Sequence, residues 1–319
     1  MRIVFMGTGE IGLPSLRFLL DTPGYEVLAA VTQPDKAAGR KLELRPSAIK
    51  LLALERNVPV LQPLKLRAPD SVAQFAELQP DAIVVMAYGQ ILPKSVLEMP
   101  RLACLNLHAS LLPRHRGAAP IHAAIEAGDA VTGITVMYMA EGLDTGDILL
   151  EKATPIRRRD TGGSLHKRLG IVAAKALSEA LSLLAEGRAP RAPQDESRAT
   201  YAAKLTRENG EIAWTETAEK IERRIRAMNP WPAAHTHFPT SEGTRMLKVF
   251  SAIRHRKDSG PAGVVLRADR RGILVGAGNG AVLLREVQME GRKRMSARDF
   301  LAGHPITPGL VLGPRAHAI

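Results

Sequence analysis

The 319-residue sequence has one cysteine and lacks long apolar runs. A single thiol, Cys104, excludes an internal disulfide framework and any zinc site built on several thiolates. No stretch approaches the roughly 18 apolar residues that a membrane helix requires. The first residues read as a strand that enters a glycine turn, not as a signal peptide. We therefore expect a cytoplasmic protein with no membrane partner.

Positive charge is spread unevenly along the chain. Residues 1–187 hold 21 Lys and Arg against 19 Asp and Glu, a net charge of +2. Residues 188–319 hold the remaining 23 Lys and Arg against 13 Asp and Glu, a net charge of +10. A small domain with this excess attracts polyanions through long-range steering and counterion release. Nucleic acid fits this charge, although a basic surface that serves only solubility is the alternative.

The pattern of the first 187 residues is typical of an α/β fold. Apolar runs alternate with helical patterns, which predicts a Rossmann-like open parallel sheet with helices on both faces. The expected strands are 3–6, 27–31, 58–61, 82–86, 102–108 and 134–139, and the expected helices are 13–20, 47–56, 71–77 and 164–184. This region, 1–187, is the predicted catalytic domain.

The remaining sequence predicts a small second domain. Residues 188–203 are rich in proline, small and charged residues and form the predicted linker. A helix is then expected at 217–228, followed by short strands at 234–238, 246–253, 263–266, 272–275 and 281–287. Such strands, separated by turns, predict a β-barrel of the OB-like type over residues 204–319.

A glycine-rich turn follows the first expected strand. Gly7-Thr-Gly-Glu-Ile-Gly12 matches the G-x-G-x-x-G dinucleotide pattern between a strand and a helix. A dinucleotide site also needs an acidic residue at the end of the second strand, whereas that strand ends in Val31-Thr-Gln33 and Asp35 follows a proline. We therefore favour a tight turn that needs glycine for steric reasons, and we expect no NAD.

Three polar residues carry the predicted chemistry. Asn106 and His108 are two residues apart at the end of a strand, so their side chains share one face. Asp144 follows the 134–139 strand, from which its loop can reach the same crevice beyond the carboxyl ends of the strands. A hydrogen-bonded strand end is the alternative for an isolated Asn-x-His pair.

An amide, an imidazole and a carboxylate together suit formyl or acyl transfer to an amine. The Asn106 amide and a His108 N–H would stabilise the oxyanion of the tetrahedral intermediate. Asp144 would orient the imidazole and help remove the proton from the attacking ammonium. The amine is itself the nucleophile, so Ser110 and Cys104 need no covalent role.

These segments resemble the signature of the formyltransferases that use 10-formyltetrahydrofolate. The resemblance rests on Asn106-Leu-His108, on Ser110-Leu-Leu-Pro-Arg-His-Arg-Gly-Ala-Ala-Pro120 and on Gly142-Leu-Asp-Thr-Gly-Asp147. It implies that 10-formyltetrahydrofolate is the co-substrate and that the catalytic trio consists of Asn106, His108 and Asp144. It also implies folate contacts from Ser110, Leu111, Leu112 and Pro113, and a pterin pocket wall that includes Tyr88 and Gly89.

Other segments resemble the branch of that family that formylates methionine attached to initiator tRNA. The loop Thr32-Gln-Pro-Asp-Lys-Ala-Ala-Gly-Arg-Lys41 is similar to a basic insertion that approaches the tRNA acceptor end. The similarity implies tRNA contacts from Arg40, with Lys41 and Arg45 beside it, although a mobile surface loop is the alternative. Asn229-Pro-Trp-Pro232 also resembles the start of that branch's C-terminal domain, and the net charge of +10 fits a tRNA-facing surface.

Two other classes stay open at this point. A formyltransferase for a nucleotide sugar or glycinamide ribonucleotide would keep the trio but would not need a strongly basic second domain. An RNA-binding protein without catalysis would need the barrel but not Asn106, His108 and Asp144 together. We expect the initiator-tRNA enzyme, acting as a monomer, with no metal because the histidines lack convincing ligand spacing.

Overall fold

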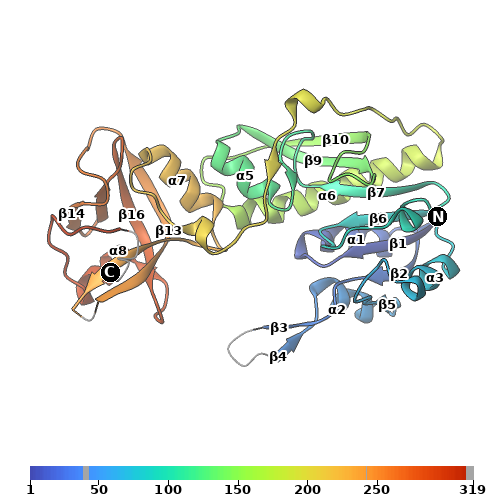
Figure 1. Cartoon of the computed structure of the whole chain (residues 1–319), viewed down its shortest axis with the longest axis horizontal. Coiled ribbons are helices and arrows are strands. Elements are labelled where there is room, and N and C mark those ends of the chain that lie inside the picture. The colour runs from blue at the N-terminus through green and yellow to red at the C-terminus, as the bar shows by residue number, and fades with distance from the viewer. Residues whose placement is uncertain (39–42, 242, 314–319) are drawn as a thin grey trace. The chain divides into compact units, whose positions relative to one another are not determined.

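The computed structural model describes residues 1–38, 43–241 and 243–313 of a chain that forms two compact units (Figure 1). The first unit contains Met1–Pro120, Val131–Pro155 and His166–Ala202. The second contains Ile121–Ala130, Ile156–Leu165 and the chain from Ala203 onward. The units therefore interleave along the sequence, and the predicted boundaries at residues 187 and 204 stay a prediction.

A seven-stranded sheet forms the centre of the first unit, in the order β10-β9-β7-β6-β1-β2-β5. Its strands are β1 Arg2–Gly7, β2 Glu26–Val31, β5 Val60–Leu61, β6 Ala82–Met86, β7 Ala103–His108, β9 Val131–Tyr138 and β10 Ile148–Pro155. The strands from β7 to β5 run parallel, as predicted. At the other edge β9 lies antiparallel to both β7 and β10. The sheet is thus mixed, because β9 runs against both of its neighbours, and residues 139–147 join β9 to β10 as a hairpin.

Helices pack against both faces of this sheet. They are α1 Leu13–Asp21, α2 Ala48–Glu55, α3 Pro69–Glu77, α4 Lys94–Leu97 and α6 Gly162–Ala185. α5 Pro120–Ala127 precedes β9 in the chain and belongs, from Ile121 onward, to the second unit. Val4 and Met6 of β1 belong to a core cluster that includes residues of α3 and α4. Phe5, between them in a strand, points to the opposite face and lies close to Gly12, just before α1. Alternate side chains of β1 therefore pack against helices on opposite faces of the sheet.

An antiparallel sheet dominates the second unit, in the order β12-β13-β16-β15-β14 with β17 beside β16. The elements are β12 Ala234–Thr240, β13 Gly243–His255, β14 Val265–Asp269, β15 Gly272–Gly276, β16 Ala281–Met289, β17 Met295–Ser296, α7 Ala218–Ala227 and α8 Ala297–Gly303. His237 of β12 bridges Gly313, and Val264, beside β14, bridges Val311. Residues 311–313 thus connect the two outer strands, which closes the sheet as a small barrel requires.

Two short strand pairs complete the described chain. β3 Lys36–Ala38 pairs with β4 Glu43–Arg45. In the first unit, β8 Arg116–Gly117 pairs in parallel with β11 Tyr201–Ala202. The second pair lies directly after the strand that carries Asn106 and His108, and it brings the predicted linker segment to that end of the sheet.

Candidate active site

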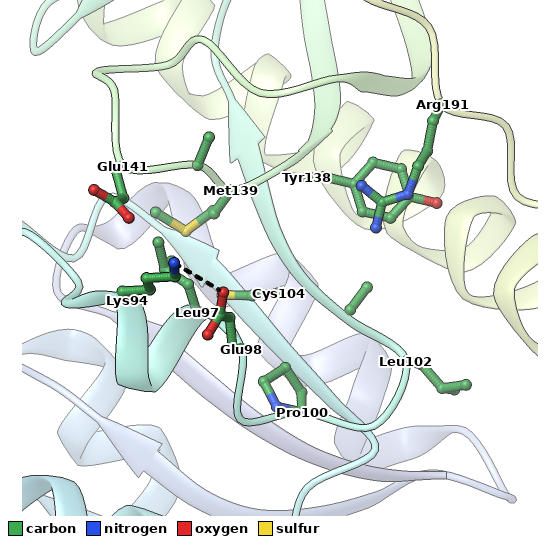
Figure 2. Close-up of a pocket in the computed structure, with 12 residues that line it drawn as sticks. Lys94, Leu97, Glu98, Pro100, Leu102, Cys104, Tyr138, Met139, Glu141 and Arg191 are labelled. Carbon is green, nitrogen blue, oxygen red and sulfur yellow. Dashed lines mark ion pairs between the residues drawn. The ribbon is translucent and has the colours of Figure 1, made fainter.

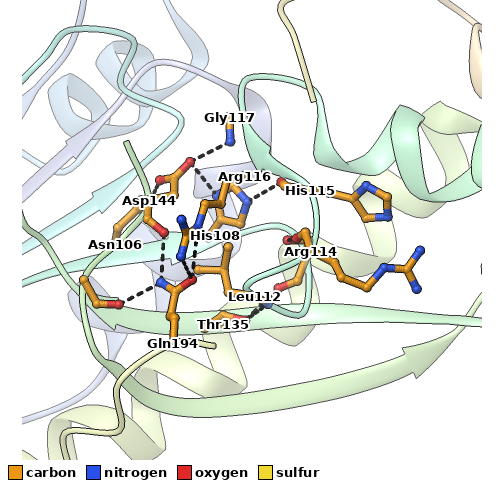
Figure 3. A network of polar contacts seen from close by, with 12 residues as sticks. Asn106, His108, Leu112, Arg114, His115, Arg116, Gly117, Thr135, Asp144 and Gln194 are labelled. Atoms are coloured by element: carbon orange, nitrogen blue, oxygen red, sulfur yellow. Dashed lines mark hydrogen bonds and ion pairs between the residues drawn. The ribbon is translucent and has the colours of Figure 1, made fainter. Parts of the chain in front are cut away.

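The structure brings the three predicted polar residues together. Asn106 and His108 lie in the last three residues of β7, and Asp144 lies in the loop between β9 and β10. The Asn106 side-chain amide donates to Asp144 Oδ1 at 3.3 Å, and His108 Nδ1 lies 3.6 Å from Asp144 Oδ2 (Figure 3). His108 is only 6% exposed. An amide, an imidazole and a carboxylate therefore face one another in a largely dehydrated place, where electrostatic interactions are strong.

The other nitrogen of His108 fixes the orientation of the ring. Nε2 lies 2.9 Å from the carbonyl oxygen of His115. A carbonyl oxygen only accepts hydrogen bonds, so Nε2 carries a hydrogen and donates it. Nδ1 is left facing Asp144 at a distance longer than a hydrogen bond. A hydrogen on Nδ1, which is present only when the ring is doubly protonated, would be attracted by the carboxylate without forming a hydrogen bond to it.

Asp144 is held in an unusual backbone conformation. Its φ is +52°, in the left-handed region that residues with a side chain rarely adopt. The backbone N–H of Gly117 donates to Asp144 Oδ2 at 2.8 Å, and the Gln194 side-chain amide donates to the Asp144 carbonyl oxygen at 2.8 Å. Gly117 lies within the motif that the sequence points to. Gln194 lies in the predicted linker, and nothing in its sequence context signals this contact.

The segment predicted to contact folate forms a buried turn next to the trio. Ser110 is fully buried and its hydroxyl donates to the Arg114 carbonyl oxygen at 2.6 Å. The Leu112 N–H donates to Thr135 Oγ1 at 3.0 Å, and the Leu112–Pro113 peptide bond is cis. Leu111 is half-buried and Pro113 is buried. The backbone of this segment is thus fixed by β9, while its part in folate binding stays a prediction.

Tyr88 and Gly89 follow β6 at the same end of the sheet. Tyr88 belongs to the core cluster, is 2% exposed, and burial raises the pKa of its hydroxyl to about 12. Within the described part of the chain, that hydroxyl has no hydrogen-bond partner. The Tyr88 carbonyl oxygen accepts from Thr8 Oγ1 at 3.0 Å and from Gln33 Nε2 at 3.3 Å. Gly89 has a φ of +88°, which glycine adopts without strain.

A cavity of about 440 Å³ opens beside the strand that carries Asn106 (Figure 2). Its lining includes Cys104, which belongs to β7, and Glu141, which belongs to the loop that holds Asp144. The remaining lining residues are Lys94, Leu97, Glu98, Pro100, Leu102, Ala103, Tyr138, Met139, Ala140 and Arg191. Tyr88, Gly89 and residues 110–113 are not part of this lining. The lining combines apolar side chains with a few charged ones, as small-molecule sites commonly do.

Neither candidate nucleophile near the trio is activated. Burial raises the pKa of the Cys104 thiol to about 12, so it stays protonated near neutral pH. The Ser110 hydroxyl donates to a backbone carbonyl oxygen, and no described base accepts its hydrogen. The geometry therefore suits a reaction in which the substrate brings its own nucleophile.

The glycine-rich turn is explained by packing. A Cβ on Gly7 would lie 2.9 Å from the Met86 carbonyl oxygen, too close for any side chain. The N–H groups of Thr8 and Gly9 both donate to the Ala87 carbonyl oxygen, at 3.1 and 3.3 Å. Two donors that a dinucleotide phosphate would need are thus already engaged, which favours the steric explanation.

The residues predicted to contact tRNA are only partly described. Arg40 and Lys41 lie outside the described residues. Arg45 is exposed and ends β4, opposite Lys36 of β3. Just before β3, Asp35 pairs with Lys50 at 2.7 Å and accepts a hydrogen bond from Gln62 at 2.8 Å. The hydrogen bond from Lys50, and next the one from Gln62, hold the pKa of the Asp35 carboxyl below its usual range. This network anchors the base of the loop.

Over residues 1–38, 43–241 and 243–313, no cluster of three or more His, Cys, Asp or Glu side chains has the arrangement of a metal site. In the same ranges, no helix is both long enough and apolar enough to cross a membrane.

Comparison with known proteins identifies the family. Residues 1–181 match the Formyl transferase family and residues 204–305 match Formyl transferase, C-terminal domain. The methionyl-tRNA formyltransferase of Geobacter sulfurreducens is 46% identical over 98% of this chain and 97% of its own length. That of Pseudomonas paraeruginosa is 49% identical over 94% of this chain and 95% of its own length.

Solved structures with a similar fold are more distant in sequence. WlaRD, a sugar 3N-formyl transferase solved with dTDP and 5-N-formyl-THF, has a TM-score of 0.66 and 18% identity, covering 92% of this chain and 99% of its own. HypX from Aquifex aeolicus, solved with tetrahydrofolic acid, has a TM-score of 0.61 and 20% identity, covering 94% of this chain and 47% of its own. These likenesses concern the fold. By its two family matches and its identity to full-length relatives, the chain belongs to the methionyl-tRNA formyltransferase family.

Proposed function

We propose that this protein transfers the formyl group of 10-formyltetrahydrofolate to the amino group of methionine carried by initiator tRNA. The observation that carries the proposal is the Asn106–His108–Asp144 constellation, which forms in the structure without an activated nucleophile beside it. The relatives named methionyl-tRNA formyltransferase support the choice of acceptor.

Asn106 provides the first element of catalysis. One hydrogen of its side-chain amide goes to Asp144, and none of the described residues accepts the other. We assign that second hydrogen to the formyl oxygen, which gains negative charge as the amine adds to the carbonyl carbon. Because Nε2 already donates to the His115 carbonyl oxygen, the second donor to the formyl oxygen would be Nδ1 of the doubly protonated His108 ring, which lies 3.6 Å from the same carboxylate. Two fixed donors in a dehydrated place stabilise such charge far better than water does.

Asp144 provides the second element, which is the removal of a proton. Its oxygens already accept from Asn106 and from the Gly117 N–H, so the carboxylate is fixed in position. A carboxylate also has lone pairs left to accept a proton from the attacking ammonium, directly or through a water. The side chain is 13% exposed, which leaves it a path to the substrate and solvent.

We assign the cavity next to β7 to one part of the folate co-substrate, and the predicted contacts from Tyr88, Gly89 and residues 110–113, which lie outside the cavity lining, to another part. Its walls offer apolar contact from Leu97 and Met139, and Glu141 offers a carboxylate to ring nitrogens. No member of the trio lines the cavity, so the formyl end of the bound folate would have to extend from it towards Asn106 to supply the formyl carbon. One loop contributes Glu141 to this cavity and Asp144 to the trio, so occupation of the cavity and alignment of the trio would depend on the same segment.

The second unit offers a surface for the tRNA backbone. A cavity of about 850 Å³ within this unit is lined by seven arginines, against three acidic side chains. The arginines are Arg157, Arg158, Arg159, Arg223, Arg226, Arg254 and Arg285. Three of them pair with Glu219 or Glu222. In the described structure Arg157, Arg158, Arg159 and Arg285 have no ion-pair partner, so their charge remains for phosphates. Arg40, Lys41 and Arg45 would add contacts near the acceptor end.

The test is formyl transfer from 10-formyltetrahydrofolate to three acceptors: methionylated initiator tRNA, the same tRNA uncharged, and free methionine. The proposal expects rapid transfer to the charged tRNA alone. Transfer to amino sugars or to purine precursors, with none to charged tRNA, would overturn the assigned acceptor and keep the family chemistry. Failure of every acceptor, with the enzyme folded, would overturn the proposed reaction.

A further inference from the structure

The segment 191–202, here called the strap, packs along the catalytic end of the sheet in the first unit. The Arg191 guanidinium lies 3.7 Å from the ring centre of Tyr138, and Ala192 forms a two-way backbone bridge with Ile148. At the other end of the strap, the Thr200 carbonyl oxygen accepts from the Arg116 N–H at 2.8 Å, and β11 pairs with β8. A segment predicted as a linker is thus bonded to the protein at both ends.

Between these anchors, Gln194 clamps the loop that carries Asp144. Its side-chain amide nitrogen donates to the Asp144 carbonyl oxygen and to the Gly146 carbonyl oxygen, both at 2.8 Å (Figure 3). Both hydrogens of the amide are therefore used on one loop. The loop packs so closely at Gly146 that a Cβ there would collide with the Tyr138 carbonyl oxygen.

Arg116 sets the orientation of this amide. The Gln194 side-chain oxygen accepts from Arg116 Nε at 3.1 Å and from a terminal nitrogen of the same guanidinium at 2.8 Å. Arginine is only a donor, so the amide oxygen must face Arg116 and the amide nitrogen must face the loop carbonyls. The guanidinium is fully buried and forms a two-bond pair with Glu196, and this hydrogen-bonded partner raises the Arg116 pKa further. The orientation of Gln194 is therefore specified by a permanent charge.

The clamp acts on a strained residue. Asp144 has a φ of +52°, a strained conformation for a non-glycine residue that persists where its surroundings enforce it. Gln194 holds the backbone carbonyl of Asp144, while the Gly117 N–H holds its carboxylate. Gly117 directly follows Arg116, so one short strand supports both hydrogen bonds. Without the backbone bond, the carboxylate would have only its side-chain contacts to define its place.

We propose that Gln194 is a positioning residue for catalysis: oriented by Arg116, it fixes the Asp144 loop in the geometry in which the carboxylate faces Asn106 and His108. The inference rests on the proposed function for its kinetic consequences only. Gln194 contacts neither reacting group; it acts through the two loop carbonyls. Its effect should fall on turnover, because small misplacements of a catalytic group cost rate without a matching loss of binding.

Two substitutions separate the parts of the contact. Gln194→Leu removes the amide and both of its roles. Gln194→Glu keeps an oxygen for Arg116 but, when ionised, offers no hydrogen to the Asp144 and Gly146 carbonyls. Each should lower kcat about tenfold to a hundredfold, with KM for folate and for tRNA changed less than about threefold. Asp195→Ala is the matched control, because the side chain of the exposed Asp195 bonds only Ser197 within the strap, and it should keep kcat near that of the unaltered protein.

Hydrogen exchange measured by mass spectrometry gives a readout that does not depend on activity. Both Gln194 variants should exchange faster in peptides that cover residues 140–147, with unchanged exchange in β1 and β6. Unaltered kcat in the Gln194→Glu variant, or equal losses in the Asp195→Ala control, would overturn the inference. If the unaltered protein transfers no formyl group, the proposed function fails. Unchanged hydrogen exchange of residues 140–147 in both Gln194 variants would instead overturn the positioning role, whatever the activity. If the Gln194→Leu variant does not fold, the Gln194→Glu variant retains the Arg116 contact and serves alone.

Discussion

The Asn106 amide nitrogen and Asp144 Oδ1 lie 3.3 Å apart although 38 residues of chain separate them. β7 delivers Asn106, and the loop after β9 delivers Asp144, because these two strands are neighbours in the sheet. The contact uses one hydrogen of the amide, and among the described residues the other has no acceptor. Because members of the trio contact one another, the replacement of one residue also removes a contact of its neighbour.

Replacement of His108 should separate catalysis from binding. His108→Ala removes a donor to the developing oxyanion and the imidazole that faces Asp144, so kcat should fall by about 10²–10⁴-fold. The affinity for methionylated tRNA should change little, because the ring is buried and contacts the protein. Single-turnover rates and equilibrium tRNA binding measure the two quantities. A large loss of tRNA affinity with an intact chemical step would contradict the catalytic assignment. The control is His304→Ala, which removes the imidazole of the residue that follows α8 in the second unit.

Cys104 should resist alkylation in the folded protein. With a thiol pKa of about 12, only about one thiol in 10⁴ is ionised at pH 8, and the side chain is buried. Treatment with iodoacetamide at pH 8 should leave the native protein unmodified and fully active, as intact mass and formyl transfer would show. The unfolded protein in denaturant should react readily. Rapid labelling of the native protein would mean that the thiol is exposed and ionised, against the described environment.

The arginine cavity of the second unit should set the salt dependence of RNA binding. The double substitution Arg158→Ala/Arg159→Ala removes two exposed charges that have no ion-pair partner in the described structure, so the slope of log affinity against log salt should fall by about 1–2. Folate binding should not change. Arg270→Ala/Arg271→Ala, in the turn between β14 and β15, removes the same charge from another exposed site. Equal losses in both double variants would show that net charge, rather than this cavity, determines affinity.

Arg40 should affect the use of tRNA and not of folate. Arg40→Ala should lower the rate at limiting methionylated tRNA about tenfold, in line with the loss of a phosphate contact. Folate binding, measured by fluorescence titration, should stay the same. An unaltered rate at limiting tRNA would show that Arg40 has no part in the use of tRNA and that this loop is an ordinary surface segment. Arg45→Ala, at the exposed end of β4, tests the one described residue of the predicted tRNA contacts in the same way.

Local sequence determined the elements and the position of the trio along them. Short continuous apolar runs predicted β1, β2, β6 and β7, and the predicted helix and strands of the second unit are all present. A spacing of two residues is sufficient to place Asn106 and His108 on one face of a strand. The glycine turn is also local, since Gly7 and Gly12 are required by the residues packed directly around them.

Tertiary structure decided how distant segments meet. β10 and the antiparallel edge of the sheet were not predicted, because strand direction depends on the neighbouring strand and not on the strand's own sequence. The role of residues 191–202 was also not predicted: a stretch rich in proline and charge has no periodicity that could reveal its partners. Gln194 lies 50 residues beyond Asp144 in the chain, and its contact with the Asp144 carbonyl is with a backbone atom, which every residue possesses. A hydrogen bond to such an atom leaves no mark on the sequence of the residue that accepts it, and only the folded chain brings the two together.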